Sequence, residues 1–102
     1  MSEKVTLIIS AQPNKENMAD IQGYSEKATP LFMQGGGEVI GRFENQGMVI
    51  GEKAAPVTVL VNFESEEAAR GVFETPEYKE LIPMRDRAFA MLNVFIAKNT
   101  MG

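Results

Sequence analysis

The segment that runs from a strand pattern directly into a helix signal constrains the fold most. Residues Val57–Phe63 (VTVLVNF) alternate in polarity, with three valines and a phenylalanine on one face, which is the period of a half-buried β-strand. Ser65 follows, and a serine there can accept a hydrogen bond from the first turn of a helix. Glu66 and Glu67 place negative charge at the positive end of that helix. The chain therefore combines a strand and a helix that are only a few residues apart.

Two further elements precede this segment. Residues 4–10 (KVTLIIS) are β-branched and apolar and indicate a first strand. Asn14 can cap a helix that the glycines at residues 35–37 end, with a kink at Pro30. The apolar residues at helical spacing are Met18, Ile21, Ala28 and Leu31. We expect this stripe to be the buried face of the first helix.

The middle and the end of the chain supply the remaining elements. Residues 38–50 (EVIGRFENQGMVI) alternate weakly and contain turn-forming glycines, so we expect a long strand with a bulge or turn inside it, followed by a turn at residues 52–56. Thr75 and Pro76 are a cap and a first helical residue, which predict a short helix that continues, kinked at Pro83, to residue 92. Residues 93–98 then form the last strand.

The order of these elements predicts an α+β fold of the ferredoxin-like type. Strand, helix, strand, strand, helix and strand form the βαββαβ arrangement, a four-stranded antiparallel sheet with helices on one face. A chain of 102 residues suits one such domain, and we assign residues 1–102 to it. Two helices cover only one face of the sheet, so the other face needs a different explanation.

The second face of the expected sheet is too apolar for water and too polar for a dry core. It carries Ile8, Leu60 and Phe95 between polar residues such as Thr6 and Asn62. Packing against the same face of an identical subunit would cover it by two-fold symmetry and could enclose a partly polar cavity. We therefore expect a homodimer.

Composition removes several classes of function. The chain has no histidine and no cysteine, which excludes the usual general base, the usual haem ligand, thiolate metal sites and cysteine nucleophiles. Its net charge is −4 with scattered basic residues, so we expect no nucleic-acid binding. The apolar stretches are far shorter than the roughly 20 residues of a membrane helix. We expect no membrane partner, a cytoplasmic location, no cofactor and no metal.

Most of the chain, from residue 23 to residue 98, resembles the DUF1330 family. The segments that carry the resemblance are GYSEKATPLFMQGGGEVIGRF and VNFESEEAARGVFETPEYKELIPMRDRAFAMLNVFIAK. The resemblance implies a ferredoxin-like fold and the pairing of two sheets into a dimeric α/β barrel. The wider superfamily includes cofactor-independent monooxygenases, lactone isomerases, haem-dependent enzymes and binding modules, so the resemblance leaves the function open. This chain differs from the enzymatic relatives in having no histidine.

Two arginines are candidates for binding an anion. Arg42 should point, by the parity of Val39 and Phe43, to the face opposite those residues, where it could clamp a carboxylate or enolate. A salt bridge to a carboxylate such as Glu44 is the simpler interpretation. Arg85 lies at the expected mouth of the barrel and could neutralise an anionic ligand there, or it could be a solvated partner of neighbouring acids.

Asn62 and two tyrosines offer polar groups without a charge. Asn62 ends the mixed face of the clearest strand, where its amide could bind an oxyanion or cap a turn. Tyr24 and Tyr78 offer hydroxyls and aromatic walls, although packing alone would explain both. The glutamates near Ser65 are explained by the helix dipole rather than by a metal ion.

Two functional hypotheses follow. The first is a dimeric small-molecule binding or structural module whose cavity between the sheets holds a modest organic anion, or nothing. The second is a cofactor-independent monooxygenase or isomerase that acts on a small acidic carbonyl compound, with Arg42, Asn62 and either Tyr24 or Arg85 stabilising an enolate. An enzyme would need an arginine and Asn62 to converge in one closed cavity.

Overall fold

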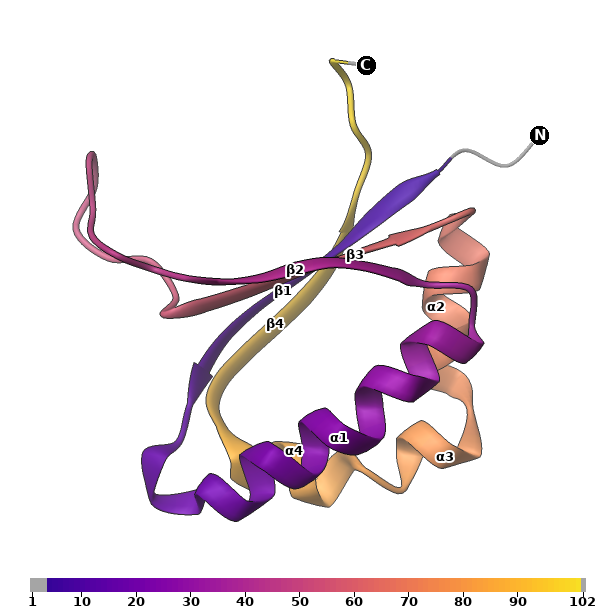
Figure 1. Ribbon diagram of the computed structural model, residues 1–102, viewed down its shortest axis with the longest axis horizontal. Helices are drawn as coiled ribbons and strands as arrows, with labels where there is room; N and C mark the ends of the chain where they lie inside the picture. Colours follow the sequence, from indigo (N-terminus) through magenta and orange to yellow (C-terminus); the bar gives the residue numbers. More distant parts are fainter. Residues whose placement is uncertain (1–3, 102) are drawn as a thin grey trace.

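The computed structural model describes residues 4–101, so residues 1–3 and 102 of the expected domain lie outside the described part. The elements are β1 (Val5–Pro13), a 3-10 turn η1 (Lys15–Asn17), α1 (Met18–Gln34), β2 (Glu38–Glu44), β3 (Val57–Phe63), α2 (Glu66–Glu74), α3 (Pro76–Lys79), α4 (Ile82–Ala88) and β4 (Phe89–Ala97). All pairings in the sheet are antiparallel, in the order β2-β3-β1-β4. The helices lie together on one side of it (Figure 1). The predicted ferredoxin-like α+β fold is confirmed.

The core lies between the sheet and the helices. Leu7, Val61 and Phe63 project from the central strands and are almost fully buried, and burial stabilises each such side chain by roughly 1.5–3 kcal/mol. The helices contribute Tyr24, Ala28, Phe32, Ala69 and Val72. The stripe predicted for α1 was partly wrong, because Met18 is 70% exposed and the fully buried positions are Tyr24, Ala28 and Phe32.

The predicted helix caps form as expected. The Ser65 hydroxyl accepts a hydrogen bond of 3.1 Å from the backbone N–H of Ala68, and the Thr75 hydroxyl accepts one of 3.1 Å from that of Tyr78. Asn14 also accepts a bond, from the N–H of Glu16, but it caps the 3-10 turn that precedes α1. These local signals fix where α2 and α3 begin.

Besides the first strand, which was expected to end at residue 10 but runs to Pro13, two predicted boundaries are wrong. The strand expected at residues 38–50 ends at Glu44, and residues 45–56 form a loop that joins β2 to β3. The helix expected to reach residue 92 ends at Ala88, and β4 begins at Phe89. The second difference arises because β1 runs to Pro13, so that Ala11 pairs with Leu92 and Pro13 with Phe89. Pairing with β1 overrides the helical preference of this alanine- and leucine-containing stretch.

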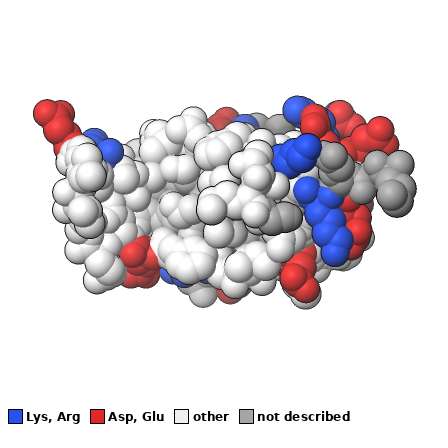
Figure 2. All heavy atoms as spheres, turned by 90° about the horizontal axis from the view of Figure 1, so that it is seen from above, with Lys and Arg blue, Asp and Glu red and all other residues white. Residues whose placement is uncertain are grey.

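The sheet face away from the helices is largely uncharged. Ile8 lies beside Leu60 on one neighbouring strand and beside Phe95 on the other, so the three form a row across the sheet. Phe43 lies on the same face beside Thr58, and the side chains of Phe43 and Phe95 are half exposed. Figure 2 shows this side as a broad uncharged surface with charges gathered toward its ends. We call it the open face.

No helix among residues 4–101 has the length and apolar content needed to cross a lipid bilayer.

Candidate functional site

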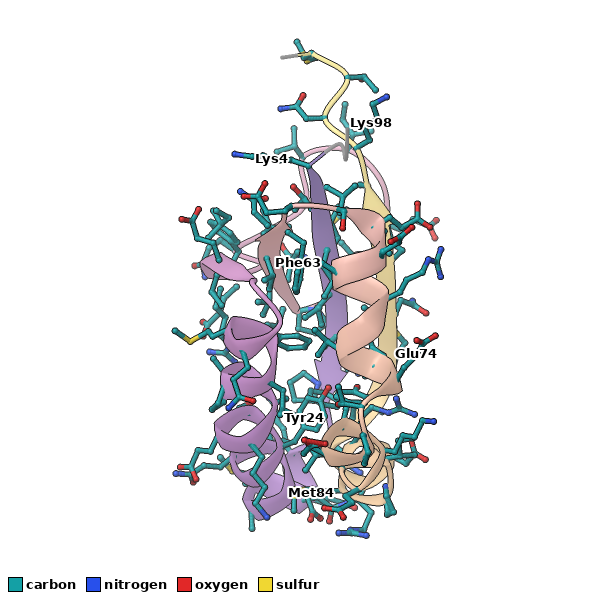
Figure 3. All side chains as sticks on the ribbon, turned by 90° about the vertical axis from the view of Figure 1, so that its right-hand side faces the viewer. Lys4, Tyr24, Phe63, Glu74, Met84 and Lys98 are labelled. Atoms are coloured by element: carbon teal, nitrogen blue, oxygen red, sulfur yellow. The ribbon has the colours of Figure 1, made fainter. Side chains whose placement is uncertain are left out.

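Tyr24, Tyr78 and Arg85 form a chain of polar contacts within the helical layer, with Tyr78 in the middle. The Tyr24 and Tyr78 hydroxyls lie 2.8 Å apart and share a hydrogen bond, and both side chains are buried. Their rings meet edge to face, with centroids 6.3 Å apart. Figure 3 shows Tyr24 between α1 and the chain of α3 and α4. A polar contact therefore links α1 to α3 inside an otherwise apolar core.

Arg85 extends this contact toward the surface. Its Nη1 donates to the Tyr78 hydroxyl at 3.4 Å, and its guanidinium carbon lies 5.9 Å from the centroid of the Tyr78 ring. The hydrogen bond to Tyr78 raises the pKa of Arg85, so the side chain is permanently charged. Arg85 thus presents a fixed positive charge that a buried tyrosine orients.

The hydrogen bonds of Arg85 are long. Its Nε and Nη2 both reach one oxygen of the exposed Asp86 at 3.4 Å, near the outer limit of hydrogen bonding. The neighbouring Arg70, in contrast, bonds Glu66 at 2.7 Å. A carboxylate that approached Arg85 at the usual distance of about 2.8 Å would make stronger bonds than those it has. Arg85 is therefore the pocket arginine that is free to engage a ligand.

A pocket of about 640 Å³ opens beside Arg85, between α2 and the free edge of β4. Its volume lies within the range of about 300–1,000 Å³ that is usual for small-molecule sites. Leu7, Phe73, Tyr78, Val94, Phe95 and Ile96 form the apolar part of the lining, and Glu66, Arg70, Glu74 and Arg85 form the charged part. A second hollow of about 510 Å³ adjoins it and shares Arg85 and Val94. We call the first the Arg85 pocket.

The Arg85 pocket wraps around the edge of β4. Val94 and Ile96 pair with Ile9 and Leu7 on the helix-covered face, whereas Phe95 pairs with Ile8 on the open face. All three β4 residues line the pocket. The pocket is therefore continuous with the rim of the open face.

Arg42 does not lie where the sequence predicted. The register between β2 and β3 shifts between Val39 and Gly41, so both Val39 and Arg42 pair with residues of the helix-covered face, Val61 and Val59. Phe43 is the residue that lies on the open face. Arg42 is exposed and lies 3.5 Å from Glu44, which is the salt bridge considered as its simpler interpretation.

Asn62 lies on the open face, as expected for its strand. Its Oδ1 accepts a hydrogen bond of 2.7 Å from the Thr6 hydroxyl. It does not line the Arg85 pocket. Within one chain, the four candidate residues therefore separate into Tyr24 with Arg85 on the helix side, Asn62 on the open face and Arg42 on the edge strand β2.

The sequence predictions missed the role of Tyr78, which bridges the two candidates that do meet. A signal exists for its position, because the Thr75 cap and Pro76 fix the start of α3 and place Tyr78 in its first turn. Arg85 lies on the separate helix α4, so spacing along one helix does not predict their contact. Among the described residues, no three acidic, histidine or cysteine side chains gather in a way that could hold a metal ion.

The Tyr24 hydroxyl should make stability depend on alkaline pH. Burial raises the pKa of Tyr24 far above its ordinary value of about 10, and the hydrogen bond to Tyr78 raises it further. Above about pH 10 the unfolded chain loses this proton while the folded chain keeps it, so stability falls by up to about 1.4 kcal/mol per pH unit. Urea unfolding across this range should show a steeper fall for the native protein than for Tyr24→Phe. Equal slopes would contradict the assignment.

Comparison with known proteins places the chain in a family. The family model described as "Domain of unknown function (DUF1330)" matches residues 6–99. The chain belongs to the DUF1330 family. The resemblance inferred from the sequence is thus confirmed over nearly the whole chain. No curated protein sequence matches this DUF1330 chain.

Solved structures share the fold of this DUF1330 protein at low sequence identity. A protein of unknown function from Rhodopseudomonas palustris is 15% identical, with a TM-score of 0.84 over 100% of this chain and 86% of its own. A candidate antibiotic biosynthesis monooxygenase from Bacteroides thetaiotaomicron is 16% identical, with a TM-score of 0.67 over 97% and 91%. A dimeric ferredoxin-like protein of unknown function from Bacteroides fragilis is 11% identical, with a TM-score of 0.62 over 94% and 96%. At these identities the likeness shows the fold alone.

Proposed function

We propose that this DUF1330 protein is a homodimeric binding module for a small organic anion, with Arg85 as the residue that holds the anionic group. The observation that carries the proposal is the position of Arg85: its charge is oriented by Tyr78 at the wall of a pocket with one apolar side and one charged side, and its hydrogen bonds are long. The proposal keeps the cytoplasmic location that we expect from the sequence.

The lining of the Arg85 pocket narrows the class of ligand. Phe73, Val94 and Ile96 provide an apolar wall that suits a hydrocarbon or aromatic body. The guanidinium of Arg85 can form two parallel hydrogen bonds to a carboxylate. Glu66 and Glu74 also line the pocket, and their charges would repel a ligand with several negative groups. A monocarboxylate with an apolar body fits these features best.

The open face supports the homodimer. A partly exposed row of apolar residues that ends in the half-exposed Phe95 is the kind of surface that a second copy covers by two-fold symmetry. The dimeric ferredoxin-like protein from Bacteroides fragilis is an example of this fold as a dimer.

The enzymatic alternative has less support within one chain. It needs Asn62 and an arginine in one cavity, but Asn62 bonds Thr6 on the open face, away from the Arg85 pocket. Because its pKa is raised, the Tyr24 hydroxyl stays protonated at neutral pH and can donate a hydrogen bond but cannot act as a base. Catalysis with residues from two subunits stays a prediction.

Calorimetric titration with phenylacetate tests the proposal, with phenylacetamide as the matched neutral ligand. We expect phenylacetate to bind and the amide to bind at least about tenfold more weakly, because only the anion makes charge-assisted bonds to Arg85. Arg85→Gln should remove this preference. Arg87→Gln is the matched control, because Arg87 lies on the same helix, bonds Asp20 and does not line the pocket.

Two results would reject the proposal. One is equal binding of the acid and the amide by the native protein. The other is unchanged binding of phenylacetate by Arg85→Gln.

A further inference from the structure

The charged side of the Arg85 pocket carries one acid that has no ion-pair partner among the described residues. Glu66, Arg70 and Glu74 follow one another at intervals of four residues along α2, and all three line the pocket. Arg70 forms an ion pair of 2.7 Å with Glu66. Among residues 4–101, no side chain forms an ion pair with Glu74. Glu74 is therefore the acid of this lining that is available to a ligand.

The position of Glu74 in its helix favours a bound cation. A glutamate four residues before an arginine is the better arrangement on a helix, so Arg70 pairs with Glu66 rather than with Glu74. Glu74 is the last residue of α2, at the negative end of the helix dipole, and the last turn of α2 contains no basic residue. A cation beside Glu74 would be stabilised by both the carboxylate and the dipole.

Glu74 and Arg85 adjoin the same pair of aromatic rings. The rings of Phe73 and Tyr78 meet edge to face, with their centroids 4.8 Å apart. Glu74 follows Phe73 directly in the chain, and the guanidinium of Arg85 lies over the Tyr78 ring. Figure 3 shows Glu74 at the end of α2, beside β4. One apolar wall is therefore bordered by an available negative charge and an available positive charge.

We propose that the ligand of the Arg85 pocket is an amino acid with an apolar side chain, held by its carboxylate on Arg85 and by its ammonium group on Glu74. This inference rests on the proposed function and deepens it, because it names the group that the second charge recognises. The guanidinium offers two parallel donors to the carboxylate, and the ammonium group donates to the carboxylate of Glu74. Phe73, Val94 and Ile96 contact the apolar side chain.

The charge balance of the pocket also favours a zwitterion. Two glutamates and two arginines line it, and the pairing of Glu66 with Arg70 leaves one charge of each sign. A simple anion would engage Arg85 alone and would lie in the same pocket as a carboxylate that repels it. An amino acid carries both charges and matches both residues.

Calorimetric titration with phenylalanine tests this inference, with 3-phenylpropionate as the matched ligand that lacks only the ammonium group. We expect the native protein to bind phenylalanine about five- to tenfold more tightly, the size expected for an exposed ion pair assisted by a helix dipole. Glu74→Gln should bind the two ligands equally. Glu67→Gln should keep the preference, because Glu67 is an exposed residue of the same helix that does not line the pocket.

Urea unfolding shows that the binding result does not come from a damaged fold. Glu74→Gln removes a carboxylate from the negative end of α2, so its unfolding midpoint should not lie below that of the native protein. A lower midpoint would mean that the Glu74 carboxylate stabilises the fold, which would contradict its assignment as an acid without a partner.

Two binding results would overturn the inference. One is binding of 3-phenylpropionate by the native protein that is as tight as the binding of phenylalanine. The other is a preference for phenylalanine that Glu74→Gln retains.

The Arg85→Gln variant separates this inference from the proposed function. If the binding of 3-phenylpropionate depends on Arg85 but phenylalanine binds no more tightly, the proposed function stands and the ammonium contact fails. If the binding of phenylalanine depends on Glu74 but is unchanged in Arg85→Gln, the ammonium contact stands and the proposed function fails.

Discussion

A Gly37→Ala variant should be less stable than the native protein by about 2–3 kcal/mol. A Cβ atom at this position would lie 2.7 Å from the carbonyl oxygen of Phe32, 2.8 Å from Cζ of Phe63 and 2.9 Å from Cγ1 of Val61. The Phe63 and Val61 side chains are almost fully buried in the core, so neither can move aside easily. The close approach of β2 to the end of α1 therefore requires a residue without a side chain.

Gly36→Ala is the matched control for this effect. Gly36 adopts a φ of 91°, which an alanine tolerates poorly, but no atom lies within 4 Å of the point that an alanine Cβ would occupy. Its cost should be only about 1 kcal/mol, from backbone strain. Urea unfolding of both variants measures the difference. Equal losses would show that the turn conformation, and not the packing at residue 37, requires glycine.

A Tyr78→Phe variant should lose about 2 kcal/mol, more than Tyr24→Phe. The Tyr78 hydroxyl bonds both the Tyr24 hydroxyl and Arg85, so its removal leaves the buried Tyr24 hydroxyl without this partner. Removal of the Tyr24 hydroxyl leaves Tyr78 bonded to Arg85. Among the described residues, every buried side-chain nitrogen or oxygen has a hydrogen-bond partner, which makes the loss of one costly.

The double variant Tyr24→Phe, Tyr78→Phe should lose less than the two single variants together. With both hydroxyls gone, no buried group is left unpaired between the rings, and the edge-to-face packing of the rings remains. Urea unfolding of the four proteins completes this double-mutant cycle. Losses that add would mean that the two hydroxyls are not coupled and that Tyr78 does not connect the core to Arg85.

The fold could be predicted from the sequence because its signals are local. The alternation in Val57–Phe63 and the caps at Ser65 and Thr75 depend on residues within one turn or one strand, and each appears in the structure as expected. The start of β4 at Phe89 could not be predicted, because it depends on pairing with the end of β1, more than 70 residues earlier in the chain.

The candidate site was less predictable, because it too depends on contacts between distant parts of the chain. The bulge predicted within residues 38–50 is present, as a register shift between Val39 and Gly41. It moves Arg42 to the other face, and the sequence did not fix the position of the bulge relative to Arg42. The sequence offered Tyr24 and Tyr78 separately, each as a hydroxyl and aromatic wall that packing alone would explain. Their contact joins positions 54 residues apart, and only the packing of α1 against α3 brings them together.

Phenylacetate titration of the ¹⁵N-labelled protein, followed by NMR, tests the central claim most directly. If the Arg85 pocket is the binding site, the largest shifts should fall on the amides of Tyr78, Arg85, Val94 and Ile96 and on the Arg85 Nε–H. The amides of Leu60 and Asn62, on the part of the open face formed by β3, should change little. Shifts concentrated at Leu60 and Asn62 would place the ligand between the two sheets and would contradict the account.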